Sequence, residues 1–167
     1  MAEGALEGWN MGAGTAQSYY EKGIETSLQE WTTATAGEII AYINSSNTPS
    51  DIKDAYNSGA MNNVPVLFKS AGTKEEKLEQ IITQKWLALY PDGWEAWTEL
   101  RRTGYPKLYP RLNSDNLDVP ANAIMRRVKF VISEFSNNKV AMEAAQKLPE
   151  LGGGDKNNTK VWWDKKP

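Results

Sequence analysis

The chain of 167 residues contains neither cysteine nor histidine. Without cysteine it has no disulfide, no thiol nucleophile and no thiolate ligand for a metal. Without histidine, a catalytic triad with an imidazole base and a zinc site of the usual ligands cannot be built. These two absences exclude the hydrolases and metalloenzymes that depend on such groups.

An excess of charge of one sign is also missing, since 19 basic and 21 acidic side chains leave a formal net charge of −2. The lysines and arginines stand singly or in pairs and never form a stripe. We therefore expect no nucleic acid partner, because such a partner requires a basic patch. No apolar run is long enough to span a bilayer, and no signal peptide is recognisable.

A pair of carboxylates near tryptophans is the remaining route to an enzyme, one of the glycoside hydrolase type. The candidates are Asp92, Glu95, Glu99 and Asp164. Asp92 and Glu95 stand at helix-cap positions, and Glu99 lies one turn beyond Glu95 on an ordinary helix face. We therefore predict that the protein is not an enzyme.

Two further motifs favour structural roles. Residues 12–15, GAGT, open a helix as a phosphate-binding loop does, but they follow a helix where a dinucleotide fold needs a strand. Asp155, Asn157 and Thr159 imitate the first ligands of a calcium loop, yet position twelve is Lys166 instead of glutamate. We expect a solvated turn there, no metal site and no cofactor.

The densest pattern of the chain lies in residues 74–108. Thr73 followed by Glu76 forms a capping box, in which the hydroxyl accepts an amide hydrogen bond and the carboxylate reaches back to the cap. Pro91 ends the helix that begins there. The apolar stripe of this helix, at steps of three and four, consists of Leu78, Ile81, Ile82, Trp86 and Leu89.

A second helix follows after a short joint. Asp92 caps it, and it carries two tryptophans. Arg101 and Arg102 place positive charge at its C-terminus, and Gly104 can close the last turn in the left-handed conformation. Because the joint is so short, we predict that the two helices fold back on each other as an antiparallel pair over 74–102.

Another helical pair is predicted over residues 2–31. The first helix, 2–9, begins directly after Met1 with no capping residue before it, which indicates a chain that starts inside a helix. The second, 15–31, has an apolar face that includes Gly23. Glycine inside a helix costs about 1 kcal/mol against alanine, so we expect another backbone to cross closely at that point.

Between and after these pairs the pattern is weaker. A capping box of Thr35 and Glu38 predicts a short helix, and residues 44–72 then form a long irregular insertion rich in Asn, Ser, Gly and Pro. Segment 105–132 is broken by prolines and is predicted to be extended. A last helix over about 137–148 is predicted to bury Val140, Ala141, Ala144, Ala145 and Leu148.

Residues 84–108, QKWLALYPDGWEAWTELRRTGYPKL, resemble the signature of SusD/RagB-like proteins, the glycan-binding lipoproteins of Bacteroidetes outer membranes. Three other segments agree in the expected order, namely AEGALEGW at 2–9, TAQSYYEKGIETSL at 15–28 and DKNNTKVWWDKK at 155–166. The resemblance therefore runs over most of the chain, and residues 37–72 and 111–123 are unmatched.

The resemblance implies a mainly all-α fold, with paired helices of a tetratricopeptide-like superhelix and long irregular loops. Because family members are several times longer, residues 1–167 would form a single fragment, the C-terminal part of such a protein, with a C-terminal segment at 105–167. The intact protein would lie at the outer membrane and the cell surface. The cysteine that carries its lipid anchor would then lie upstream of this fragment.

The same resemblance implies a function for the intact protein in polysaccharide utilisation and nutrient uptake. It would bind a glycan and hand the oligosaccharide to a SusC-type TonB-dependent transporter. Its mechanism would be binding and hand-over, with no bond made or broken.

Seven Trp and seven Tyr against three Phe indicate a preference for rings with polar edges. Such rings suit sugar recognition, because C–H groups of a pyranose stack on the ring while hydroxyls find donors and acceptors nearby. The rings predicted to pack in the core, in phase with helical stripes, are Tyr19, Tyr20, Trp31, Trp86, Trp94 and Trp97. The ligand-binding candidates lie off any stripe and are Tyr56, Tyr105, Tyr109, Trp162 and Trp163.

Two alternatives remain open at this point. A helical-repeat scaffold could instead hold a peptide or a protein on its surface. The fragment could also form a homodimer through an exposed apolar end. Ring exposure distinguishes glycan binding from peptide binding, since a glycan platform needs two or three open Trp or Tyr faces and a peptide site needs an apolar groove.

Overall fold

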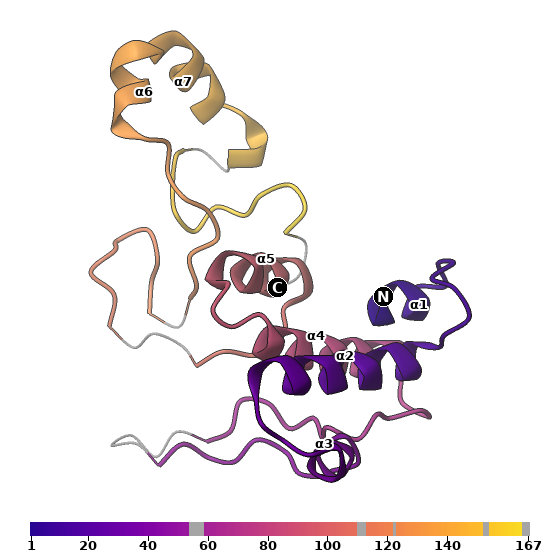
Figure 1. Cartoon of the computed structure of the whole chain (residues 1–167). Coiled ribbons are helices and arrows are strands. Elements are labelled where there is room, and N and C mark those ends of the chain that lie inside the picture. Colours follow the sequence, from indigo (N-terminus) through magenta and orange to yellow (C-terminus); the bar gives the residue numbers. More distant parts are fainter. Residues whose placement is uncertain (54–58, 110–112, 122, 152–153, 165–167) are drawn as a thin grey trace. The chain divides into compact units, whose positions relative to one another are not determined.

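The computed structural model describes residues 1–53, 59–109, 113–121, 123–151 and 154–164. Within these ranges it contains seven α-helices, one short 3₁₀ helix and no strand, so the predicted all-α class is confirmed (Figure 1). The elements are α1 (Ala2–Leu6), α2 (Ala16–Trp31), α3 (Ala36–Ile43), α4 (Lys74–Ala88), α5 (Gly93–Thr103), α6 (Ile132–Asn137), α7 (Lys139–Gln146) and η1 (Pro149–Leu151).

The chain divides into two compact units. The first unit comprises Met1–Leu100 and Tyr105–Lys107, and the second comprises Arg101–Gly104 and Leu108–Pro167. No helix in the described ranges combines the length and the hydropathy that crossing a membrane requires.

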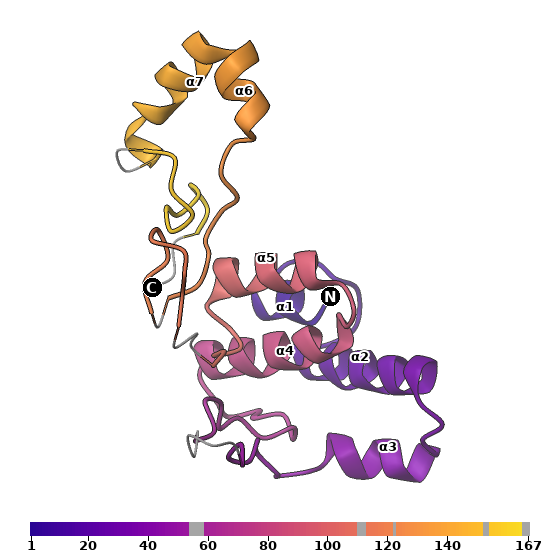
Figure 2. The ribbon, with the colours of Figure 1, turned by 90° about the vertical axis from the view of Figure 1, so that its left-hand side faces the viewer.

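The core of the first unit lies between α1, α2 and α4 (Figure 2). Ile82 of α4 is completely buried there. Tyr20 of α2 packs its ring against Phe68 at a centroid distance of 5.2 Å, and its hydroxyl donates a 2.6 Å hydrogen bond to the Val66 carbonyl. Burial raises the pKa of the Tyr20 hydroxyl. The apolar stripes predicted from sequence therefore supply this core.

The long insertion 44–72 has no helix in its described part, yet its end is tightly held. Val64, Val66 and Phe68 are buried. The buried Gln80 side chain donates to the carbonyls of Pro65 and Leu67 at 2.7 and 2.9 Å, and it accepts from the amide of Lys69 at 2.9 Å. The Gln80 side chain thus bonds to three backbone groups of this segment, as a neighbouring strand would in a sheet.

The helix starts follow the capping signals in the sequence. Thr15, Thr35 and Thr73 each accept a hydrogen bond from the amide three residues on, at 3.1, 3.4 and 3.2 Å. Asp92 accepts one from the amide of Glu95 at 3.1 Å and so starts α5. These contacts confirm the predicted starts of four helices.

Side-chain contacts connect α4 and α5. α4 ends at Ala88, ahead of Pro91, and α5 begins at Gly93. Lys85 of α4 contacts Glu95 at 3.0 Å and Glu99 at 3.3 Å on α5, which joins the two helices. Beyond α5, Gly104 has the predicted left-handed conformation, with a φ of 78°.

Two details of the N-terminal pair differ from the prediction. α1 ends at Leu6, short of the expected residue 9, and Gly8 follows with a φ of 83°. A Cβ placed on Gly23 would meet nothing within 4 Å, so the expected close backbone crossing does not occur. Gly23 is exposed, whereas Tyr20 and Ile24 of the same helix are buried.

The C-terminal helix also differs from the prediction. The helix expected over about 137–148 is present as α7, and a further short helix, α6, precedes it. Asn138, with φ −138° and ψ 41°, separates the two. The predicted buried face is wrong, since Val140 is 83% exposed and Leu148 is exposed as well. Met142, on the opposite side of α7, is the buried residue instead.

Candidate functional site

Four of the five candidate ligand-binding rings lie in the described residues, and they are divided between the two units. Tyr56 lies outside the described residues. Tyr105 belongs to the first unit, whereas Tyr109, Trp162 and Trp163 belong to the second.

Tyr105 makes contacts within the protein that hold its ring in place. It packs at the edge of the core of the first unit, and its hydroxyl donates a 3.0 Å hydrogen bond to Glu75. Burial and this bond to a carboxylate raise the pKa of the Tyr105 hydroxyl to about 12. A ring held in this way is positioned to stabilise the packing of the segment after α5 against α4.

Trp162 and Trp163 are neighbours with opposite environments. Trp162 is 74% exposed, so its ring is accessible. Trp163 is half-buried, and the guanidinium of Arg101 lies 4.7 Å from the centroid of its ring. This cation–π contact anchors Trp163, and Trp162 is left as the accessible ring of the pair. Tyr109 is exposed as well.

The rings predicted to lie in the core are only partly there. Tyr20 is buried, and Tyr19, Trp86 and Trp97 are half-buried. Trp31 and Trp94 are 63% and 70% exposed, so the core prediction is wrong for these two. Both stand at helix ends, where a residue in phase with an apolar stripe can extend beyond the element it packs against.

Sequence reasoning also missed Tyr90. Its side chain is 81% exposed at the joint between α4 and α5. The available signal was its place directly before Pro91, beyond the last turn of the helical stripe.

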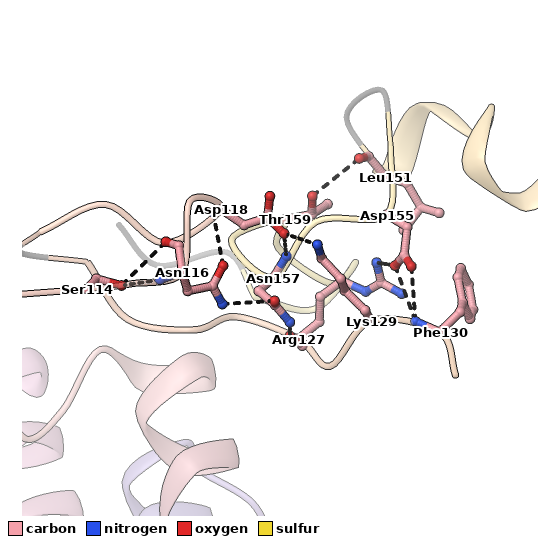
Figure 3. Close-up of polar contacts among 10 residues, drawn as sticks. All are labelled: Ser114, Asn116, Asp118, Arg127, Lys129, Phe130, Leu151, Asp155, Asn157 and Thr159. Carbon is pink, nitrogen blue, oxygen red and sulfur yellow. Dashed lines mark hydrogen bonds and ion pairs between the residues drawn. The ribbon is translucent and has the colours of Figure 1, made fainter. Parts of the chain in front are cut away.

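The second unit contains a cluster of polar and charged side chains (Figure 3). We call it the C-terminal cluster, and it consists of Asn116, Asp118, Arg127, Lys129, Asp155 and Asn157. Arg127 pairs with Asp155 at 2.6 Å, and Asp155 also accepts from the amide of Phe130 at 3.1 Å. Lys129 pairs with Asp118 at 2.5 Å. The cluster therefore joins three separate segments of the unit.

Asn157 is the centre of this cluster (Figure 3). Its backbone carbonyl accepts from the amides of Arg126 and Arg127 at 2.7 and 3.1 Å, and its side-chain amide donates to the Arg127 carbonyl at 3.0 Å. Its side-chain oxygen accepts from Asn116, and its backbone amide donates to Asp118. The Lys129 ammonium and this amide bond hold the pKa of the Asp118 carboxyl below its ordinary value.

The arginines make contacts within the protein. Arg126 pairs with the buried Asp164 at 3.0 Å, and Arg101 donates a 2.7 Å hydrogen bond to the Arg126 carbonyl. Their contacts thus connect the end of α5, the segment at 126–127 and the C-terminal segment. The sequence DKNNTKVWWDKK accordingly contributes internal contacts through Asp155, Asn157 and Asp164.

The internal contacts of Asp155 and Thr159 do not fit the calcium loop that the spacing of these residues resembles. The Asp155 carboxylate is taken by Arg127 and Phe130, and the Thr159 hydroxyl donates to the Leu151 carbonyl at 3.3 Å. Across the described residues, no three acidic side chains gather into a group that could hold a metal ion. These contacts of Asp155 and Thr159 fit a structural role better than metal binding.

A groove of about 440 Å³ lies between α2 and α3 in the first unit. Its α2 side is polar, and Lys22 and Gln29 both bond to Glu25 there, at 2.8 and 3.2 Å. Its α3 side is apolar and includes Ile39, Ile40 and Ile43. A groove with one polar and one apolar wall can accept an amphipathic segment.

Comparison with protein families gives a match over nearly the whole chain. The SusD-like family model, described as Susd and RagB outer membrane lipoprotein, matches residues 1–164. A comparison with curated proteins gave no match.

Solved structures that are similar to this chain come from the same family. A SusD homologue of Bacteroides thetaiotaomicron is 40% identical with a TM-score of 0.87, and the alignment covers 99% of this chain and 36% of that one. A chitin-binding SusD homologue of Flavobacterium johnsoniae is 43% identical with a TM-score of 0.85, covering 99% and 34%. A SusD homologue of Bacteroides ovatus is 42% identical with a TM-score of 0.85, covering 99% and 35%. The chain thus spans about a third of the length of these proteins.

Proposed function

This chain belongs to the SusD-like family, and on that premise we propose that it is part of a receptor that binds an oligosaccharide at the bacterial cell surface. The receptor hands its ligand to a SusC-type TonB-dependent transporter and makes or breaks no bond. The predicted resemblance is confirmed, as is the mainly α-helical, tetratricopeptide-like fold class.

One observation carries the proposal. The homologue from Flavobacterium johnsoniae that is described as chitin-binding is 43% identical over 99% of this chain. Identity at this level supports a shared ligand class, because it is accompanied by the same fold at a TM-score of 0.85. The class we propose is therefore a glycan, and the exposed rings of Tyr109 and Trp162 stay candidates for contact with it.

The carboxylates that could have served glycoside hydrolysis support a non-enzymatic function. Glu95 and Glu99 both contact Lys85, at 3.0 and 3.3 Å. Asp92 accepts the amide bond that starts α5, and Asp164 is paired with Arg126. Each of these groups has a structural partner, whereas a general acid needs an environment that keeps it protonated.

The proposal is tested on the complete protein and on this chain in parallel. Affinity electrophoresis in gels that contain chitin derivatives, xylan, starch or β-glucan should retard the complete protein in at least one gel. Chromatography of the same glycans after incubation should show no shortened product. Co-purification from membranes should recover a TonB-dependent barrel. Release of short products, or no retardation in any gel, contradicts the proposal.

A second candidate function rests on the groove between α2 and α3. Its apolar wall of Ile39, Ile40 and Ile43 and its polar α2 wall fit an amphipathic peptide better than a sugar ring. A homodimer is the further alternative for a chain with exposed apolar residues on α7. Light scattering on the purified chain separates a monomer from a dimer, and Ile40→Asp should abolish peptide binding without changing glycan retardation.

A further inference from the structure

The joint between α4 and α5 carries two largely exposed aromatic rings. Tyr90 is 81% exposed and Trp94 is 70% exposed, and only three residues separate them. We call this pair the joint aromatics. Neither ring belongs to the core cluster of the unit, and each exposes more of its surface than Trp97, which is half-buried one turn further along α5.

The backbone under the joint aromatics is well fixed. The amide of Asp92 donates to the Leu89 carbonyl at 2.5 Å, and the amide of Gly93 donates to the Pro91 carbonyl at 2.9 Å. The Asp92 carboxylate then caps α5 through the amide of Glu95. A constrained backbone reduces the conformational entropy that the joint loses when a ligand binds, which favours affinity.

The ring of Trp94 is also oriented. Trp97 lies against it with a centroid distance of 5.6 Å and an interplanar angle of 60°. A tilted contact of this kind supports one side of the indole and restricts its rotation. Because Trp94 remains 70% exposed despite this contact, most of the ring surface is accessible to a ligand.

Charged groups surround the joint, and they indicate which class of ligand fits. Glu95, next to Trp94, is paired with the partly exposed Lys85 at 3.0 Å, and Asp92 is exposed. The buried centre of a protein interface is depleted of charged residues, because burying them costs desolvation energy. A sugar instead presents C–H groups to an aromatic face while its hydroxyls bond to charged and polar groups at the rim.

We propose that Tyr90 and Trp94 form a subsite that stacks a pyranose ring of a glycan. Trp94 provides the main stacking face, Tyr90 provides a second contact along the glycan, and the rim of Lys85, Asp92 and Glu95 meets the sugar hydroxyls. This inference deepens the proposed function and rests on it, since it assumes that the ligand is a glycan. A single stacked sugar on an open surface is expected to bind with a dissociation constant of about 1 mM.

The test labels the full chain with 5-fluorotryptophan and follows its ¹⁹F NMR resonances. Trp94→Phe identifies the Trp94 resonance, and Trp31→Phe identifies that of an exposed control ring on α2. The hexasaccharides of chitin, cellulose, xylan and starch are titrated up to tens of millimolar. We expect at least one of them to shift the Trp94 resonance saturably while the Trp31 resonance stays in place.

Binding measured on variants completes the test. Trp94→Ala should weaken the binding of that sugar about three- to tenfold, Tyr90→Ala should weaken it less, and Trp31→Ala should leave it unchanged. Circular dichroism confirms that each variant is folded, and Trp94→Phe should retain most of the affinity because it keeps an aromatic face.

The outcomes separate this subsite from the proposed function. Sugar binding that leaves the Trp94 resonance unmoved overturns the subsite and leaves glycan binding intact. A complete protein that binds no glycan overturns the proposed function itself. Loss of the transporter barrel on co-purification with Trp94→Ala, at unchanged glycan affinity, overturns the subsite in favour of a protein interface.

Discussion

Arg127 donates a hydrogen bond of 2.6 Å to Asp155, and their side chains are only 10% and 6% exposed. Arg127 also lies 4.8 Å from the ring centroid of Phe130, whose amide bonds to the same carboxylate. Both charged groups are therefore largely shielded from water, and the attraction between them offsets the cost of their desolvation.

Replacing Arg127 by Met should destabilise the second unit strongly. The substitution removes the cation and leaves the Asp155 carboxylate buried without its charged partner, which costs about 3–5 kcal/mol. Urea unfolding followed by tryptophan fluorescence measures the loss of stability, since Trp163 reports on the same unit.

The exposed pair of Lys139 and Glu143, 3.8 Å apart in the same unit, provides the control. Glu143→Gln should cost less than about 1 kcal/mol, because exposed ion pairs contribute little. The double variant Arg127→Met with Asp155→Leu should regain most of the loss. Equal effects of Arg127→Met and Glu143→Gln would show that the buried pair has no special role.

Gln80→Ala should release the end of the long insertion from α4. The substitution removes three hydrogen bonds and leaves the carbonyls of Pro65 and Leu67 and the amide of Lys69 without their partner, at an expected cost of about 2–4 kcal/mol. Hydrogen exchange should show faster exchange of the Lys69 amide while the amides within α2 stay protected.

Gln29→Ala on the surface of α2 is the matched control, because its side chain is exposed and makes one hydrogen bond, to Glu25. Its effect on stability should lie within about 0.5 kcal/mol. If Lys69 exchanges at the same rate in Gln80→Ala and in the parent chain, the glutamine does not hold the insertion.

The capping carboxylate of Glu76 should make stability depend on pH in the acid range. Hydrogen bonds from Thr73 and Lys69 lower the pKa of Glu76 from 4.5 to about 2 in the folded chain. A carboxyl whose folded pKa is depressed stabilises the fold above its unfolded pKa, and the contribution is lost as the pH falls from about 4.5 to about 2. Thermal unfolding between pH 6 and pH 2 measures this loss.

Glu76→Gln should flatten the pH dependence in this window, because an amide can keep a capping contact but does not titrate. Glu143→Gln, on exposed α7, should leave the profile unchanged. A parent chain and a Glu76→Gln variant with the same acid profile would refute the assignment.

Tyr105 should be identified by its alkaline titration. Burial and the bond to Glu75 raise its pKa to about 12 from 10.0, so the neutral hydroxyl stabilises the fold below pH 10 and this contribution is lost between about pH 10 and 12. Absorbance at 295 nm should show tyrosines that titrate late, Tyr20 and Tyr105 among them, and Tyr105→Phe should remove one such step. If Tyr105→Phe instead removes amplitude near pH 10, the hydroxyl is not held by Glu75.

Local signals in the sequence predicted the helices with good accuracy. Thr35 and Thr73 start the helices that their capping boxes mark, and Pro91 separates α4 from α5 as expected. Capping and helix termination depend on groups within a few residues of each other, so they can be inferred without knowledge of the rest of the fold.

The candidate site was less predictable. Two of the rings predicted to contact a ligand make contacts within the protein instead: Tyr105 bonds to Glu75, and the Trp163 ring packs against Arg101. Each of these contacts joins residues 30 or more positions apart in the sequence. Trp94, predicted to lie in the core, is instead exposed. Helical phase shows which residues share a face, but it does not show how far the neighbouring element extends over that face.

The amino-acid sequence by itself determined the helical class, the starts of the helices and the family, because caps, apolar stripes and four ordered motifs are all readable along the chain. Only the tertiary structure decided which charges and rings are satisfied internally. Asn157 became the centre of a cluster, and Trp94 an exposed ring, through contacts between distant segments. Burial and pairing depend on what packs against a residue in space, and that neighbour is not given by local spacing.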